Sequence, residues 1–160
     1  MDTAKELAAL FARDLTRLIQ EVSTFSVDQQ HLLWEVRPGV SNSVGNLALH
    51  LEGNLREYVG RQLGGVAYTR DRPAEFSSKG VLSGQLATRL SEVCELVARV
   101  IAGLSPAQMD AVFPENILKA PRSTRQVLLH IYGHLSYHLG QIDYLRRLLT
   151  AGKPVDFAAL

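Results

Sequence analysis

The chain contains 160 residues, of which 46% are hydrophobic and 21% are charged. This composition is ordinary for a folded protein and too apolar for a disordered one, and the length suits one domain over residues 1–160. Seventeen basic residues against sixteen acidic residues give a net charge of +1, which excludes the positive surplus that drives binding to nucleic-acid backbones.

The first elements are expected between residues 3 and 36. Residues 3–22 carry apolar side chains at spacings of three and four, which predicts an amphipathic helix. Residues 26–36 are shorter and less regular, and we expect a short helical piece with Ser26 as its cap. The Pro38-Gly39 pair ends this piece. The apolar positions of the first helix are Leu7, Leu10, Phe11, Leu15, Leu18, Ile19 and Val22.

A second long helix is expected to begin at Ser41 or Ser43 and to end near Gly60 or Leu63. Residues 64–79 follow; they are rich in Gly, Arg, Pro and Ser and show no clear periodicity. Such a segment predicts a surface crossover between longer elements, and crossovers of this kind often carry functional residues.

Two more long helices are expected in the second half. Ser83 is predicted to cap a third helix, and Pro106 to start a short helical turn in the connection that follows. Ser123 or Thr124 caps a fourth helix that ends near Thr150, which would make it roughly 27 residues and about 40 Å long. The seam of the third helix consists of Leu86, Leu90, Val93, Val97, Val100 and Leu104.

These elements predict an all-α protein, a four-helix bundle with long crossover loops and a short extra helix. No apolar run approaches the roughly 20 residues that cross a bilayer, so we expect no membrane span, no signal peptide and a cytoplasmic location. Cys94 is the only cysteine, which excludes an internal disulfide and a Cys-rich zinc cluster. A metal would therefore have nitrogen and oxygen ligands.

The stretch HIYGHLSYHLGQ places three of the five histidines four residues apart on the last helix. The apolar seam of this helix alternates spacings of three and four, and the one position missing from it is His138, which we assign to a core slot. His134 lies at the edge of the same seam, one turn away. His130 points to the opposite flank, and we expect it to be exposed, at a cap or against another chain.

An unpartnered imidazole in an apolar seam costs roughly 1–3 kcal/mol, which a metal ion or a hydrogen bond would remove. One ion cannot bind all three, because His130 and His138 are about 12 Å apart along the axis and metal–nitrogen bonds measure about 2.0 Å. Pairs on adjacent turns remain possible, and the seam positions make His134 and His138 the inward pair. Of the two remaining histidines, His50 is preferred to His31 as a third ligand, since it adjoins the buried face of the second helix.

Other interpretations of these residues stay open. A core histidine is more often hydrogen-bonded than metal-bound, and HxxxH arises by chance in many helices. Cys94 is expected to be a small buried hydrophobe and not a nucleophile, and Trp34 to be core or pocket wall. Leu49 and Leu129 lie away from the predicted faces and could pack on a second copy, as in a homodimer, or inside this chain.

Two segments resemble a known family. SNSVGNLALHLEGNLREYV, residues 41–59, is followed by HIYGHLSYHLGQIDYLRRLL, residues 130–149, and together they are similar to the DinB/YfiT-like superfamily of bacterial four-helix-bundle metalloproteins. The first segment resembles the helix that supplies the first ligand in that family. The second resembles the HxxxHxGQ signature, which spans residues 134–141 here. The likeness in helix order covers nearly the whole chain, although only these two motifs are specific.

The resemblance implies a DinB-like bundle with a divalent metal, zinc or nickel, bound by His50, His134 and His138, the positions selected above from the residues alone. Many family members carry an arginine where this chain has Leu139. This departure leaves the ligands intact but argues against an anion-binding role at that position. Gln141, one turn after His138, is the candidate for orienting an imidazole through a hydrogen bond.

Three neutral protein ligands leave a fourth position open, which is typical of catalytic metal centres. Several relatives are thiol-dependent transferases or isomerases, so the resemblance implies an enzyme whose metal activates a low-molecular-weight thiol for transfer to a small-molecule substrate. A metal-dependent hydrolase and a non-catalytic, stress-related bundle with a structural metal remain as alternatives. A solvent-connected pocket lined by residues 64–79 and the segment around Trp34 would favour catalysis.

Overall fold

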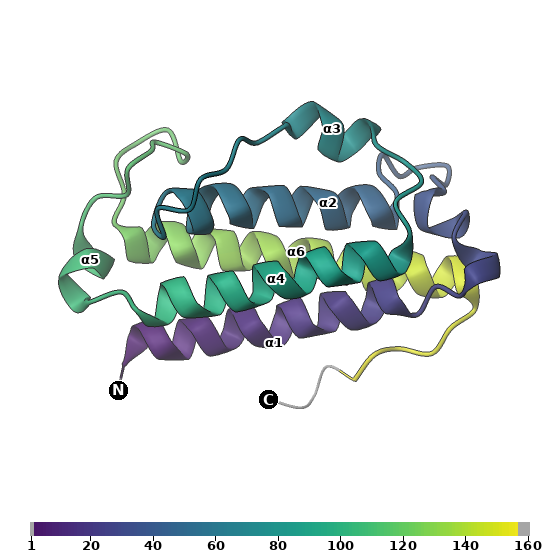
Figure 1. Ribbon diagram of the computed structural model, residues 1–160, viewed down its shortest axis with the longest axis horizontal. Helices are drawn as coiled ribbons and strands as arrows, with labels where there is room; N and C mark the ends of the chain where they lie inside the picture. The colour runs from purple at the N-terminus through teal and green to yellow at the C-terminus, as the bar shows by residue number, and fades with distance from the viewer. Residues whose placement is uncertain (1, 157–160) are drawn as a thin grey trace.

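The computed structural model describes residues 2–156 and is all-α, as predicted (Figure 1). The four long helices of the bundle are α1 (Thr3–Ser23), α2 (Val44–Leu55), α4 (Ser83–Ala102) and α6 (Thr124–Thr150). The helix α1 packs against α4 and α6, and α2 packs against the same two helices. Helices α1 and α6 run in one direction and α2 and α4 in the other (Figure 1). Among residues 2–156, no helix combines the length and the apolar character needed to pass through a membrane.

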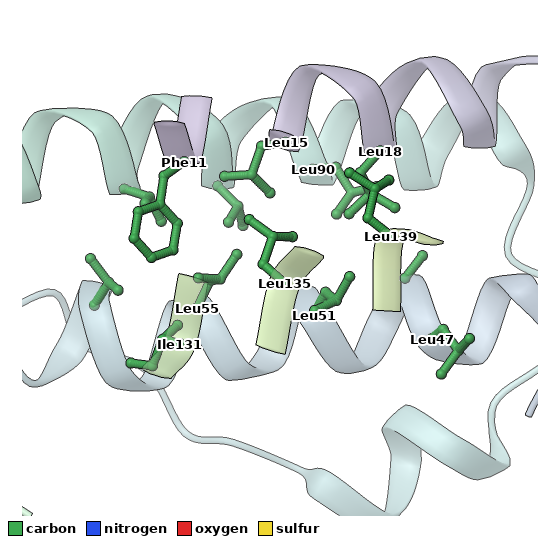
Figure 2. Packing of buried hydrophobic residues seen from close by; sticks show 14 of the residues in the cluster. Phe11, Leu15, Leu18, Leu47, Leu51, Leu55, Leu90, Ile131, Leu135 and Leu139 are labelled. Atoms are coloured by element: carbon green, nitrogen blue, oxygen red, sulfur yellow. The ribbon is translucent and has the colours of Figure 1, made fainter. Parts of the chain in front are cut away.

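A continuous apolar core fills the space between the four helices. Each helix contributes one stripe to it, because apolar residues recur at spacings of three and four on every helix. Figure 2 shows the stripes meeting, with labelled residues Phe11, Leu15 and Leu18 from α1, Leu47, Leu51 and Leu55 from α2, Leu90 from α4, and Ile131, Leu135 and Leu139 from α6.

The assignment of His138 to the core seam of α6 is wrong. Leu139 fills that slot and is 2% exposed, between the buried Leu135 and Ile142, whereas His138 is half-buried on the flank. A repeat of 3.6 residues allows the step after Leu135 to be three or four residues, so the pattern alone does not choose between the two positions. The leucine takes the interior because a buried imidazole needs polar partners and a leucine does not.

The predicted ends of the long helices agree with the structure at most positions. The hydroxyls of Ser43 and Ser123 cap α2 and α6, and α2 continues into a π-helical turn, Arg56–Arg61. The expectation for Ser83 is wrong by one residue, because Ser83 is the first residue of α4 and its hydroxyl donates to the Phe25 carbonyl at 3.2 Å.

The shorter elements differ more from the predictions. Residues 26–36 form two 3-10 turns, Val27–Gln29 and Leu32–Trp34, instead of one helical piece. The turn expected at Pro106 is the short helix α5 (Pro106–Asp110). Of the two leucines that looked spare, Leu49 is buried within the chain and Leu129 is exposed on α6.

The crossover contains a helix that was not predicted, α3 (Arg72–Ser77), which lies over α2 (Figure 1). The Asn46 side chain of α2 donates to the backbone carbonyls of Glu75, at 3.1 Å, and Ser78, at 2.9 Å. At Gly53 of α2, a Cβ atom would overlap the Glu75 carboxylate. Glycine at position 53 therefore allows α3 to bring that carboxylate against α2.

A buried ion pair joins α1 to α6. The Arg146 guanidinium donates to the Glu21 carboxylate, and the two side chains are 2% and 0% exposed. Arg146 also donates to the Lys153 carbonyl at 2.8 Å, so the same side chain holds the segment that follows α6.

Replacing Arg146 by alanine should lower the free energy of unfolding by about 3–5 kcal/mol, because it leaves the Glu21 carboxylate buried without a cation. For a chain of this length that loss corresponds to a fall in melting temperature of roughly 6–20 °C, measured by circular dichroism. The matched control is Arg147→Ala, because Arg147 pairs with Asp143 at 3.1 Å on a more exposed surface. This control should lower the free energy of unfolding by about 1 kcal/mol or less. Equal losses in the two variants would contradict this assignment.

Candidate metal centre

Three histidines from two helices meet on the flank of the bundle: His50 from α2 and His134 and His138 from α6. Each offers one ring nitrogen such that the three atoms lie within 4.8 Å of one another. The ring centroids are 4.5–5.4 Å apart. The structure thus brings together the three residues selected from the sequence, while His31 is exposed on a different segment.

The His50 ring has its two nitrogens in different surroundings. Its Nδ1 lies 2.8 Å from Oε2 of Glu75 on α3. Because the ionised carboxylate can only accept, Nδ1 carries the proton and Nε2 keeps its lone pair. This Nε2 lies 3.1 Å from Nε2 of His134. The lone pair of His50 is therefore directed into the histidine cluster.

The Glu75 carboxylate is itself held by Arg70. The Arg70 guanidinium donates from Nε to Oε1 at 2.6 Å and from Nη2 to Oε2 at 2.9 Å. Both side chains are largely buried. A two-pronged pair of this kind fixes the position of the carboxylate, which in turn orients the His50 ring.

Sequence reasoning missed Arg70 and Glu75. One local signal for α3 was present, because Asp71 accepts a hydrogen bond from the Ala74 amide at 3.0 Å and Pro73 lies in the first turn, both typical of a helix start. No local pattern predicts the contact with His50, which lies 25 residues earlier in the chain.

The His138 ring is oriented by Gln141. The Nδ1 atom of His138 lies 2.6 Å from the amide oxygen Oε1 of Gln141, one turn later on α6. Since this oxygen can only accept, Nδ1 donates and Nε2 is left with its lone pair. The hydrogen bond expected between these two residues is thus present in the structure.

Burial disfavours the charged form of two imidazoles of the cluster, those of His134 and His50. Burial, together with the charges that His138 and His50 would carry, lowers the pKa of His134 to about 4. Burial also lowers the pKa of His50, and the opposing effect of the Glu75 carboxylate is smaller. At neutral pH both rings therefore have the unprotonated nitrogen that metal coordination requires.

The geometry of the cluster fits a divalent metal ion. Metal–nitrogen bonds of 2.0–2.1 Å in a tetrahedral site place two ligand nitrogens about 3.3 Å apart, close to the 3.1 Å between His50 and His134. Within residues 2–156 the group comprises these three side chains. Neutral imidazoles are ligands for zinc, nickel, copper and iron, so the donor set is compatible with several metals.

Two pockets adjoin the cluster. The first, called the polar pocket, has a volume of about 230 Å³ and lies against His50 and His134. The second, called the apolar pocket, has a volume of about 830 Å³ and lies against His138 and Gln141. Further residues of the polar pocket are Asn54, Tyr58, Arg70, Arg72 and His130, and further residues of the apolar pocket are Val40, Leu47, Tyr137, Gly140, Tyr144 and Leu148.

The pockets agree in part with the lining expected from the sequence. Arg70 and Arg72 come from the predicted crossover. Trp34 lines neither pocket; it packs against the core and its indole nitrogen donates to the Val81 carbonyl at 3.2 Å. Cys94 is half-buried on α4. Its Sγ atom lies 3.8 Å from the Ala12 carbonyl of α1.

Comparison with known proteins agrees with this geometry. The family model of mycothiol S-transferases matches residues 4–151, and this family belongs to the DinB/YfiT-like superfamily. No curated protein matches the chain. The match extends from the first turn of α1 to the end of α6, so it includes both histidine-bearing helices and the crossover between α2 and α4. The chain therefore belongs to the mycothiol S-transferase family of the DinB/YfiT-like superfamily.

Proposed function

We propose that this protein is a metal-dependent thiol S-transferase in which His50, His134 and His138 hold a divalent cation, zinc or nickel. Its thiol substrate is mycothiol, a low-molecular-weight thiol, and its second substrate is a small electrophile. The observation that carries the proposal is the convergence of three imidazole nitrogens within 4.8 Å beside two pockets. The family match supports the thiol as the group transferred.

The chemistry requires a thiolate at neutral pH. A divalent cation at the cluster would supply it, because positive charge stabilises the deprotonated form of a thiol. In the transfer, the sulfur forms a bond to an electrophilic carbon and the bond from that carbon to its leaving group breaks with its electron pair. The thiol proton passes to solvent.

The protein's own side chains prepare the cluster for this role. Glu75 and Gln141 accept the Nδ1 protons of His50 and His138, so each of these rings presents Nε2 to the cluster. Arg70 holds Glu75 in place through two hydrogen bonds. The rings are thus oriented before any ligand binds, and little conformational freedom is lost on binding.

Of the three predictions that test this proposal, the first concerns metal content and activity. Purified protein should contain about one divalent ion per chain by elemental analysis, and it should conjugate mycothiol to 1-chloro-2,4-dinitrobenzene. The double variant His134→Ala, His138→Ala should lose both the metal and the activity, because one imidazole cannot hold the ion. Metal without conjugation across a panel of thiols and electrophiles would contradict the transferase, and ester hydrolysis under the same conditions would favour the hydrolase.

The second prediction concerns Glu75. Replacing Glu75 by alanine should weaken zinc binding about 10- to 100-fold, because the His50 ring loses the carboxylate that orients it. Competition with a chelator of known affinity measures this change. The matched control is Glu57→Ala, since Glu57 is also buried and pairs with an arginine, Arg61. The control should bind zinc as the native protein does, and equal losses in both variants would show that Glu75 acts only through general stability.

The third prediction concerns the cysteine. Burial raises the pKa of the Cys94 thiol, an effect that a hydrogen bond with Thr16 reduces only in part. Cys94 therefore stays protonated at neutral pH and is a poor nucleophile. The Cys94→Ser variant should keep the native kcat and KM, and native Cys94 should react slowly with a disulfide reagent until the protein unfolds. A folded Cys94→Ser protein without activity would contradict an external thiol as the nucleophile.

A further inference from the structure

We propose that the two pockets separate the two substrates: the polar pocket holds the polar part of the thiol, and the apolar pocket holds an uncharged, aromatic or aliphatic electrophile. The reacting atoms then meet at the histidine cluster between them. This inference rests on the proposed function and names the class of the second substrate.

The first argument is the position of the pockets. On α6, the polar pocket uses residues 130–134 and the apolar pocket uses residues 137–148. On α2 and the π-helical turn that continues it, the polar pocket uses His50, Asn54 and Tyr58, and the apolar pocket uses Leu47. Because α2 and α6 are antiparallel neighbours (Figure 1), the two pockets lie toward opposite ends of this helix pair, with the histidine cluster between them. Two ligands can therefore reach the cluster from opposite directions.

The second argument is the lining of the apolar pocket. Three large side chains of this lining are well exposed, Tyr137 at 65%, Tyr144 at 72% and Leu148 at 64%. Because they gather in one pocket, they form an exposed patch of the kind that marks a binding surface. A volume of about 830 Å³ suits a small molecule. Tyrosine rings favour flat aromatic ligands. The one arginine in the lining, Arg37, is already paired with Glu35 at 3.1 Å, so an uncharged ligand fits best.

The third argument is the polar lining of the polar pocket. Its members include the amide of Asn54, the phenol of Tyr58 and the guanidinium of Arg72. Arg72 is exposed, and its guanidinium lies 5.3 Å from the Phe76 ring centroid. Among the residues that the structure describes, none that lines this pocket carries a carboxylate. A ligand rich in hydroxyl groups and hydrogen-bond acceptors suits this lining, because an apolar ligand would cover the Arg72 guanidinium without offering it a partner.

A second copy of the chain could also cover the exposed tyrosines. Continuity with the cluster favours the small molecule, because His138 belongs to both the cluster and the apolar pocket, and Gln141, which accepts the Nδ1 proton of His138, lines the same pocket. A small molecule in this pocket therefore lies next to the histidine cluster. A second copy packed over the tyrosines would not need this proximity.

The test uses two glycines of α6. Among the described residues outside the adjoining turns of the helix, no atom lies within 4 Å of a Cβ atom built at Gly140 or at Gly133, so a side chain can begin at either position without a clash. Gly140 lines the apolar pocket and Gly133, about two turns earlier, does not. Gly140→Phe should fill the pocket and raise the KM for 1-chloro-2,4-dinitrobenzene about tenfold, with the KM for mycothiol unchanged. Gly133→Phe should change neither KM.

A binding measurement keeps the test independent of turnover and of the metal. Calorimetry with 1,3-dinitrobenzene, an unreactive analogue, should show about tenfold weaker binding to Gly140→Phe than to Gly133→Phe. For the thiol side, Arg72→Ser should raise the KM for mycothiol severalfold and leave that of the electrophile unchanged.

The outcomes separate the two proposals. If native protein conjugates no thiol, the proposed function is overturned. The calorimetry still decides in that case whether the apolar pocket binds an aromatic ligand. Conjugation by native protein with equal effects of the two phenylalanine variants overturns the assignment of the pockets and leaves the function standing. Unchanged dinitrobenzene binding together with a shift from dimer to monomer in Gly140→Phe would show that the tyrosines form an interface between copies, and would also overturn it.

Discussion

The packing of α2 against α6 is the contact on which the site depends. Each of the three histidines directly precedes a leucine that the core buries: His50 before Leu51, His134 before Leu135 and His138 before Leu139. One residue corresponds to about 100° of rotation around a helix, so a side chain next to a buried leucine lies at the edge of the buried face. The leucines fix the rotation of both helices, and this rotation directs the imidazoles toward one another.

The crossover between α2 and α4 supplies the side chains that orient His50. The helix α3 is only six residues long, and its position depends on side chains of α2, since Asn46 binds its backbone and Gly53 leaves room for Glu75. A buried carboxylate is costly unless it is paired, and Arg70 provides the pairing. The result is a chain of hydrogen bonds from Arg70 through Glu75 to His50, which links the orientation of one ligand to the fold of the crossover.

The sequence was sufficient to predict the four long helices, most of their caps and the meeting of the three histidines, because helical periodicity and capping are local and repeat over many residues. It was not sufficient to predict α3, since six residues are too few to show a period. The prediction placed His138 in the interior, because a helix is equally compatible with spacings of three and of four residues. The contact between Glu75 and His50 follows from tertiary packing, which no pattern of neighbouring residues records.

The position of His138 on the flank bears on the proposed function. In the core, a metal bound by this residue would be enclosed by leucines and could only cross-link α2 to α6. On the flank, the nitrogens of the cluster lie between the polar and the apolar pocket, and an ion there would keep a side open to small molecules. Leu139 occupies the interior position, and the core leucines stabilise the bundle. His134 and His138 are only partly buried at the edge of the core, while His50 is buried beside Glu75. A cluster placed in this way can bind ligands as well as support the fold.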